Sequence, residues 1–260
     1  MTSAQRGTLA LVFTAACAVA VFFAPAFGQP PSYHDFADRR ALLGVPNFGD
    51  VASNLPFLAV GVAGLWAIRR GGRAVFIENE ERWPYVFFFV GVLLTAFGSS
   101  CYHLAPGNGR LVWDRLPITM AFMGLIAALV ADRVSVRFGR TLTLPAVVVG
   151  LASVWYWQWT AARGAENLMP YLILQGYTIV MVLMLAVLYP SRYTEGSMIY
   201  GVFIWYALAK LLEFGDRAVF GAGGLVSGHT LKHLASGLAT FWVLRMLTAR
   251  RALAAGAIPA

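Results

Sequence analysis

Two histidines near the carboxyl end of the chain have the spacing of a metal site. His229 and His233 stand four residues apart in the run GHTLKHLASGL. If this run is helical, both imidazoles lie on one face and can reach a single zinc ion at about 2.0 to 2.1 Å. Taken alone, the pair is also explained by two hydrogen-bonded histidines that hold no metal, so further ligands must come from elsewhere in the chain.

A third histidine stands at the end of another apolar run. His103 follows Ser99 by four residues in GSSCYHL, and Asp114 follows in VWDRLP, where we place it in the first turn of the next helix. An ionisable residue in a transmembrane helix costs about 2.5 to 3.5 kcal/mol, so each one is a site candidate. Three imidazoles with an open fourth position are typical of a catalytic zinc, and this predicts zinc on His103, His229 and His233. Ser99 and Asp114 would orient water or a histidine ring.

The composition is that of a membrane protein. Of the 260 residues, 59% are hydrophobic and 12% charged, and the mean hydropathy is +0.67, which is outside the usual range of soluble domains. The net charge of +8 comes from arginines at the ends of apolar runs, not from a basic stripe, so we expect no nucleic-acid partner. Cys17 and Cys101 lie in or beside apolar runs and indicate neither a disulfide framework nor a CxxC metal site.

Eight runs of mostly apolar residues follow one another, each near the length of about 20 residues that a transmembrane helix needs. The runs cover residues 7–28, 50–68, 83–104, 112–132, 140–160, 167–189, 198–220 and 227–247. We therefore expect an all-α, polytopic membrane protein in which the last seven runs form a seven-transmembrane-helix bundle.

The first run has two interpretations. It follows MTSAQR and ends in APAFGQ, where Ala26 and Gly28 suit a small-residue cleavage site, as in a signal peptide. It is also long enough to be an extra transmembrane helix, and both interpretations stay open. The expected parts are a signal peptide or extra helix (1–28), an extracytoplasmic segment (29–48), the seven-helix domain (49–248) and a cytoplasmic tail (249–260).

The distribution of arginine predicts the orientation, because cytoplasmic loops retain positive charge. Arginines concentrate in two alternate connections and the tail: Arg69, Arg70, Arg73, Arg82, Arg133, Arg137, Arg140, Arg245, Arg250 and Arg251. With these in the cytoplasm, His103, Asp114, His229 and His233 lie at the outer ends of their helices. We expect a plasma or inner membrane with an extracytoplasmic site, although an internal membrane with a lumenal site gives the same pattern.

The remaining polar residues of the apolar runs have ordinary interpretations. Lys210 and Glu213 in LAKLLEFGDR are interpreted as an intramembrane ion pair rather than as catalytic residues, in one charged cluster with Asp216. His34 in SYHDFADRR is expected to be a solvated loop residue. Lys232 stands near a helix end, where its amine would extend to the membrane interface.

At these residues the sequence resembles the alkaline ceramidase family, within a larger group of seven-helix metal-dependent hydrolases that includes the adiponectin and progestin receptor relatives. The resemblance lies in NFGDVASNLPF at 47–57, GSSCYHLAPGNGRLVWDRLPI at 98–118 and GHTLKHLASGL at 228–238. The second block has the family's Ser-x-x-x-His followed by Asp-x-Leu-Pro, and the third has its His-x-x-x-His. Each block alone is weak, but the combination, in order along nearly all seven helices, is specific.

The resemblance implies a hydrolase that cleaves the amide bond of ceramide or a related N-acyl long-chain base, with zinc on His103, His229 and His233. Zinc lowers the pKa of a water molecule to about 7 and polarises the carbonyl. Asp114 would carry the proton from water to the leaving amine, and Ser99 would donate to the developing oxyanion. The lipid would arrive sideways from the bilayer, with its chains among apolar side chains.

The first block departs from the family. Animal alkaline ceramidases have a calcium site of acidic and amide residues near the amino terminus and the first helix. In this chain Asn47 stands at the acidic position and Asp50 at the asparagine position. This difference argues against calcium binding.

Two other functions are compatible with seven helices. One is a lipid receptor or sensor whose zinc is not catalytic, which binding without hydrolysis would favour. The other is a retinal protein, since Lys232 lies in the last helix, where a Schiff-base lysine would be expected. Its place near the helix end argues against retinal, and lack of visible absorbance after retinal addition would exclude it.

Overall fold

A computed structural model describes residues 1–254, and the side chains of all of these except residues 72–74. The described residues form helices, turns and two isolated β-bridges, with no strand among them. The predicted all-α class is therefore confirmed. The longer helices are α1 (Ser3–Phe23), α3 (Leu55–Val75), α4 (Arg82–Leu104), α5 (Asn108–Arg133), α6 (Val136–Ala161), α7 (Met169–Leu188), α8 (Ile199–Phe214) and α10 (Gly228–Ala249). The shorter ones are η1 (Pro31–His34), α2 (Phe48–Ala52), η2 (Asn79–Glu81), η3 (Gly196–Met198) and α9 (Asp216–Gly223).

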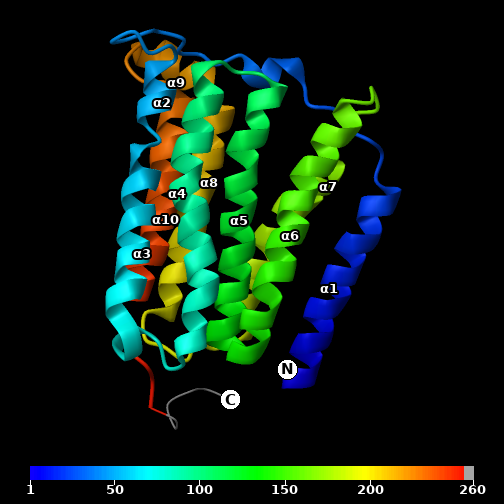
Figure 1. The fold of residues 1–260 in the computed structure, drawn as a ribbon, viewed down its shortest axis with the longest axis vertical. Coiled ribbons are helices and arrows are strands. Elements are labelled where there is room, and N and C mark those ends of the chain that lie inside the picture. Colours follow the sequence, from blue (N-terminus) through cyan, green and yellow to red (C-terminus); the bar gives the residue numbers. More distant parts are fainter. Residues whose placement is uncertain (255–260) are drawn as a thin grey trace.

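Among the described residues, seven helical spans are long and apolar enough to cross a membrane, so the chain is an integral, multi-pass membrane protein. They are Ser3–Phe23, Phe48–Gly71, Asn79–Leu104, Asn108–Arg133, Val136–Ala161, Met169–Leu188 and Gly196–Phe214. α10 is not among these seven, because the polar residues of its first turns lower its hydropathy, but it is as long as they are. Seven helices from α3 to α10 thus form the predicted bundle, with α1 as an additional helix (Figure 1).

The predicted runs match these helices to within a few residues at most ends, but two runs are divided, and the first of them, 50–68, covers the end of α2 and most of α3. The run 198–220 was expected to be one helix, but it is divided into α8 and α9 at Gly215. The division has a consequence for the site, because Asp216 becomes the first residue of α9 and its carboxylate is free to bond to other segments. Gly215 begins the second helix without a side-chain cap of its own.

α1 lies on the outside of the bundle, beside α7 (Figure 1). None of its residues is buried, and its main contacts are the Phe13 ring, stacked on Tyr177 at 5.6 Å, and the Thr14 hydroxyl, 3.3 Å from that phenol. Such a helix adds little to the core. Both interpretations of residues 1–28, as a signal peptide and as an extra helix, therefore stay open.

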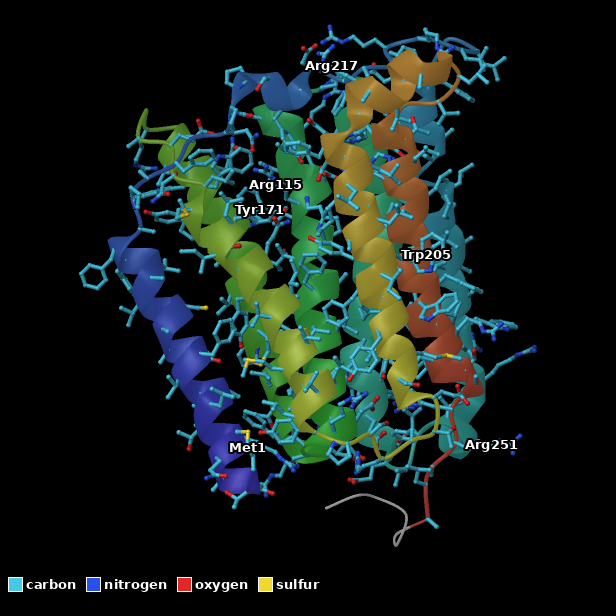
Figure 2. The ribbon with its side chains drawn as sticks, turned by 180° about the vertical axis from the view of Figure 1, so that it is seen from behind. Met1, Arg115, Tyr171, Trp205, Arg217 and Arg251 are labelled. Carbon is cyan, nitrogen blue, oxygen red and sulfur yellow. The ribbon has the colours of Figure 1, made fainter. Side chains whose placement is uncertain are left out.

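The two ends of the bundle differ in the segments that cover them. α2, α9 and the segment 29–47 gather at one end, while Met1 and Arg251 lie at the other (Figures 1 and 2). At that second end the chain after α10 runs beside the 189–195 connection, with a hydrogen bond of 2.9 Å from Thr194 N to Arg251 O. Of the predicted tail 249–260, residues 255–260 lie outside the described residues.

α4 and α5 form the closest pair of helices, and two glycines allow this approach. A Cβ added at Gly98 would lie 2.0 Å from the Trp113 carbonyl oxygen, and one added at Gly91 would lie 2.5 Å from the Ala121 nitrogen. Small residues let helix backbones approach in membranes, where apolar lipid gives no hydrophobic drive to associate. Because Gly98 precedes Ser99 and Trp113 precedes Asp114, this contact also determines how the two candidate residues face each other.

Candidate metal centre

The three predicted histidine ligands come together in one buried cluster. His103 is in the last turn of α4, while His229 and His233 are in the first two turns of α10. Each offers a ring nitrogen within 4.8 Å of the others, and all three pairs of ring centroids are 4.9 Å apart. All three residues are at most 5% exposed. The predicted convergence is therefore confirmed, and the cluster can hold one metal ion.

The donor set suits a transition metal such as zinc. His233 Nδ1 lies 2.9 Å from the Ser53 hydroxyl, which leaves Nε2 of that ring for the ion. His103 Nδ1 lies 3.9 Å from Asp50 Oδ2, and neither buried atom has a hydrogen-bond partner among the described residues. A carboxylate behind a histidine is the usual arrangement that orients a metal ligand and increases its basicity. Three imidazoles, one facing a carboxylate and one hydrogen-bonded to a hydroxyl, fit zinc better than the oxygen-preferring calcium or magnesium.

Asp50 itself is held by the start of α10. Its Oδ1 accepts a 2.7 Å hydrogen bond from the Thr230 hydroxyl and a longer one, 3.5 Å, from Ser227. Ser227 is also the N-cap of α10, and its hydroxyl accepts from the Thr230 backbone N–H at 3.0 Å. The same polar residues therefore begin the helix that carries two ligands and fix the carboxylate behind the third.

Asp216, at the break between α8 and α9, stabilises the first turn of α10. Asp216 Oδ1 accepts a 2.7 Å hydrogen bond from the His229 backbone N–H, and Oδ2 accepts one of 2.9 Å from the Ala37 N–H. A Cβ at Gly228 would lie 2.3 Å from the Leu212 carbonyl oxygen, so α8 and α10 touch at this point. Asp216 is thus a structural residue of the site rather than part of the Lys210–Glu213 pair, with which the sequence grouped it.

Ser99 and Asp114 lie beside the cluster as expected, but one detail differs. Asp114 was predicted in the first turn of its helix, and this is wrong, since α5 begins at Asn108 and places Asp114 in the second turn. The helix begins early because the connection after His103 needs few residues. The helix dipole therefore has less influence on Asp114, and its carboxylate is positioned by the contact of α4 with α5.

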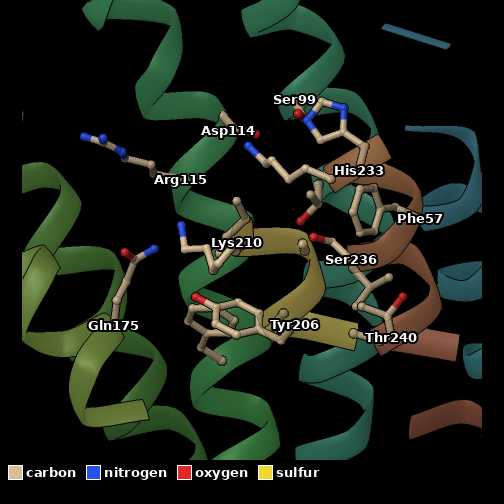
Figure 3. A pocket seen from close by; sticks show the side chains of 18 of the residues that line it. Phe57, Ser99, Asp114, Arg115, Gln175, Tyr206, Lys210, His233, Ser236 and Thr240 are labelled. Atoms are coloured by element: carbon tan, nitrogen blue, oxygen red, sulfur yellow. The ribbon is translucent and has the colours of Figure 1, made fainter. Parts of the chain in front are cut away.

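A cavity of about 170 Å³ opens next to the histidines. Ser99, Asp114 and His233 line it, with Lys210 and Arg115 further along (Figure 3). Its deeper wall is apolar and includes Phe57, Phe88, Val92, Phe122, Leu125 and Val243. The site thus combines a polar end at the histidines with an apolar space toward the middle of the bundle, which suits an amphipathic ligand.

Two neighbouring parts of the cavity wall come from α7 and α8. Both helices contribute to its lining, Tyr171 and Gln175 from α7 and Tyr206 and Lys210 from α8. α8 packs mainly on α10, whereas α7 packs on α5, α6 and α1. α5 is seen between α7 and α8 from behind (Figure 2). The two helices thus form separate parts of the cavity wall.

The segment 29–47 covers the histidines from outside the bundle. The Phe36 ring, 5% exposed, lies 4.8 Å from His103 and 4.5 Å from His229 between centroids. The prediction that His34 is a solvated residue is wrong. Its ring is half-buried and its nitrogens each lie 2.9 Å from a partner, Tyr102 on α4 and Asn108 on α5. His34 therefore ties the cover to the bundle.

An ion pair fastens the other end of this cover. Asp38 is buried and accepts hydrogen bonds of 2.8 and 2.7 Å from the Arg40 guanidinium, which also donates to the Leu225 carbonyl before α10. The guanidinium holds the pKa of the Asp38 carboxyl below its ordinary value. The cover is thus joined to both sides of the histidine cluster.

The charged residues at the cavity pair as predicted, with one addition. Lys210 Nζ lies 2.5 Å from Glu213 Oε2, so the expected ion pair is present. Lys232 was expected to extend to the interface, and this is wrong: its amine lies 3.0 Å from Glu213 Oε1 and 3.3 Å from His229 Nε2, facing the cavity. The carboxylate of Glu213 is the nearer and stronger attraction for a lysine in this position.

Phe36, Asp50 and Thr230 belong to the site but were not recognised as such from the sequence. Asp50 had a detectable signal, as an ionisable residue at the start of an apolar run, whereas nothing local marks Phe36. Asn47 and Asp50, at the family's calcium positions, make internal contacts instead, since the Asn47 side chain donates to the His103 carbonyl at 2.8 Å.

The structure thus brings the three predicted histidine ligands together and places Ser99 and Asp114 in the wall of the adjoining cavity. The resemblance to alkaline ceramidases rests on three sequence blocks, and the structure brings residues of all three together: Ser53, His103 and His233. In comparisons with protein-family models and with curated proteins, no model and no protein matches this chain.

Proposed function

We propose that the chain is an alkaline ceramidase-like enzyme, a zinc-dependent hydrolase that cleaves the amide bond of a ceramide-like lipid within the membrane. The observation that supports this best is the position of three buried histidines at the polar end of a cavity that is apolar further in. A receptor needs a ligand cavity but no potential metal ligand, serine and carboxylate at its wall. Hydrolysis uses all three.

The residues have distinct roles in this proposal. His103, His229 and His233 hold the zinc, which supplies a Lewis acid that activates water and polarises the carbonyl. Asp114 accepts a proton from the attacking water and then donates it to the nitrogen of the leaving amine. Ser99, one turn before His103 on α4, donates a hydrogen bond to the carbonyl oxygen as negative charge develops on it. Fatty acid and long-chain base are the products.

The lipid arrives from the bilayer between α7 and α8, so that its chains lie against the apolar wall and its amide meets Ser99 and Asp114. Phe36 and the segment 29–47 limit access of bulk water from above the histidines. With the arginine-rich end of the bundle in the cytoplasm, the site belongs on the extracytoplasmic side of a plasma or inner membrane.

The first test is the zinc content of detergent-purified protein by mass spectrometry. We expect about one zinc per chain in wild type and little in His229→Ala and His233→Ala. His34→Ala is the matched control, because His34 is the one histidine outside the cluster, and it should keep its zinc. Wild-type protein prepared without chelators and found free of transition metal would overturn the proposal.

The second test separates an enzyme from a receptor. Wild type should release fatty acid from N-acyl sphingoid bases, while Asp114→Asn and Ser99→Ala should keep zinc and lose about 100-fold or more in turnover. Lipid binding with full zinc but no release of fatty acid would instead favour a receptor or sensor with a non-catalytic zinc.

A further inference from the structure

One cation of the cavity has no carboxylate partner. Arg115 is 4% exposed and lies on α5 next to Asp114. Its Nη2 donates a hydrogen bond to the Gln29 side chain, whereas its Nη1 has no hydrogen-bond partner among the described residues. No carboxylate of residues 1–254 forms an ion pair with it. A buried charge without a counter-ion is costly, so this arginine calls for a ligand.

Aromatic rings hold the guanidinium in place without neutralising it. Its central carbon lies 5.6 Å from the ring centroid of Tyr33, 4.5 Å from that of Trp157 and 4.8 Å from that of Tyr171. Stacking uses the faces of a guanidinium and leaves its N–H edge for a planar anion. Arg115, Tyr33 and Tyr171 all line the cavity. The rings therefore keep Arg115 oriented at the cavity wall.

The cavity as a whole carries an excess of positive charge. Arg115, Lys210 and Lys232 line it, against the carboxylates of Asp114 and Glu213. Both lysines share the single carboxylate of Glu213, at 2.5 and 3.0 Å. A ligand with one negative charge would balance this set, whereas a neutral lipid amide would leave the excess charge in place.

We propose that Arg115 is the centre of an anion-binding subsite in this cavity, and that the ligand is a lipid amide with a carboxylate or phosphate in its head group. The amide part of this inference rests on the proposed function, and the anionic part rests on the charges of the cavity. Both anions accept paired hydrogen bonds from a guanidinium. In the view of Figure 3, Arg115 and Gln175 lie on the side opposite His233. The anionic group would thus bind at one side of the cavity while the amide faces Ser99 and Asp114 at the other.

The test compares lipids that differ in this group alone. N-palmitoylglycine and N-palmitoylethanolamine share the chain and the amide, but only the first has a carboxylate, and N-palmitoyl-phosphoethanolamine adds a phosphate to the second. Binding to wild type in detergent is measured by native mass spectrometry, which also reports zinc and any cleavage products. We expect at least about tenfold tighter binding of one or both anionic lipids than of the neutral amide, because a charge-assisted pair forms out of water. Their order tells which anion the subsite prefers.

Variants assign the preference to Arg115. Arg115→Gln should bind the neutral amide as wild type does and lose the preference for the anion, while Arg115→Lys should keep part of it. Arg163→Gln is the matched control, because Arg163 also stacks on a ring, Trp159 at 3.9 Å, but is exposed and outside the cavity lining. It should keep the full preference.

Two results would overturn the proposal: equal binding of neutral and anionic amides by wild type, or an anion preference that persists in Arg115→Gln. The wild-type comparison needs no variant and holds even if Arg115→Gln does not fold. Failure of the proposed function looks different in the same spectra, as missing zinc or missing cleavage products with the anion preference intact.

Discussion

The bundle has a buried polar cluster at each end, and the two are built differently. At the histidine end, three ligand residues without formal charge lie beside a cavity, and Asp50 Oδ2, His103 Nδ1 and Arg115 Nη1 have no hydrogen-bond partner among the described residues. At the opposite end, where Asp132, Tyr193 and Arg250 line a space of only about 10 Å³, two carboxylates meet two guanidinium groups and two phenols. These residues are Glu81, Asp132, Arg192, Arg250, Tyr85 and Tyr193.

The contacts of the second cluster are those of a structural clamp. Arg250 lies 2.5 Å from Asp132 and 3.8 Å from Glu81, and Arg192 lies 3.0 Å from Glu81. The Tyr85 hydroxyl donates to Asp132 at 2.6 Å. Positive and negative charges are balanced, so no ligand is needed. An unpaired charge beside open space thus distinguishes the histidine end from this structural cluster, although Asp132 Oδ1 and Arg250 Nη2 here also have no hydrogen-bond partner among the described residues.

The largest expected effect comes from breaking this balance. Arg250→Met leaves Asp132 and Glu81 buried with less compensation and should cost about 3 to 5 kcal/mol of unfolding free energy. The measurement is denaturant unfolding in detergent, with zinc content per folded chain unchanged. Arg251→Met is the control, since Arg251 is exposed and forms no ion pair with the described residues. An equal loss in both variants would contradict the clamp.

A smaller effect is expected where the two helices of the site touch. Gly98→Ala would force its Cβ toward the Trp113 carbonyl, which lies 2.0 Å from that position, and should cost about 1 to 3 kcal/mol. It should also move Ser99 relative to Asp114 and lower turnover while zinc stays bound. Gly109→Ala on α5, where nothing lies within 4 Å, is the control. Unchanged turnover in Gly98→Ala would mean that the α4–α5 contact does not determine the geometry.

At the histidine end, Asp50→Asn tests the contribution of the carboxylate behind His103. The amide keeps the shape of the carboxylate but loses its charge behind His103, and zinc affinity should fall about tenfold, or about 1.4 kcal/mol. This is the low end for such partners, since the separation is 3.9 Å. Zinc competition with a chelator measures it, with Asp38→Asn as a control, since Asp38 pairs with Arg40 rather than with a histidine. Equal zinc affinity in wild type and Asp50→Asn would limit Asp50 to its hydrogen bond with Thr230.

The smallest effect concerns the cover. Because Arg40 lowers the pKa of Asp38, the pair stabilises the fold above the ordinary aspartate pKa of about 3.9, and this stability is lost as pH falls through the lower pKa of the folded state. Arg40→Gln should therefore lower the melting temperature slightly at pH 7 and not at strongly acidic pH. Because Arg40 is largely exposed, salt should weaken the difference. A difference independent of pH would indicate lost packing instead.

Most of the architecture could be predicted because its signals are local. Runs of about 20 apolar residues are sufficient to predict helices in a membrane, but such a run does not reveal how its helix packs or where it is interrupted. The break at Gly215 was missed because glycine is common in transmembrane helices and only the contacts of Asp216 reveal its use. The start of α5 was also missed, since Asn108, Gly109 and Arg110 lie outside the apolar run that predicted this helix.

The candidate site divides in the same way. The residues that can bind a metal are rare in apolar runs, so His103, His229 and His233 could be recognised by type and spacing alone. The roles of the arginines were harder to predict. Arg133 and Arg250 were interpreted only as cytoplasmic charges, but Arg133 donates hydrogen bonds to carbonyls of the 186–196 region and Arg250 forms an ion pair with Asp132 in the clamp. Their side chains are committed to partners more than 50 residues away, which no local pattern records.

By itself, the sequence determined that this chain is a multi-pass membrane protein, because hydropathy and helix length are properties of short segments. It also determined which residues can bind a metal, because that depends on side-chain chemistry. Only the tertiary structure decided that Phe36 covers the histidines, that Asp50 stands behind His103 and that Arg115 lacks a counter-ion. Each of these depends on distances between segments far apart in the chain, and those distances are set by helix packing.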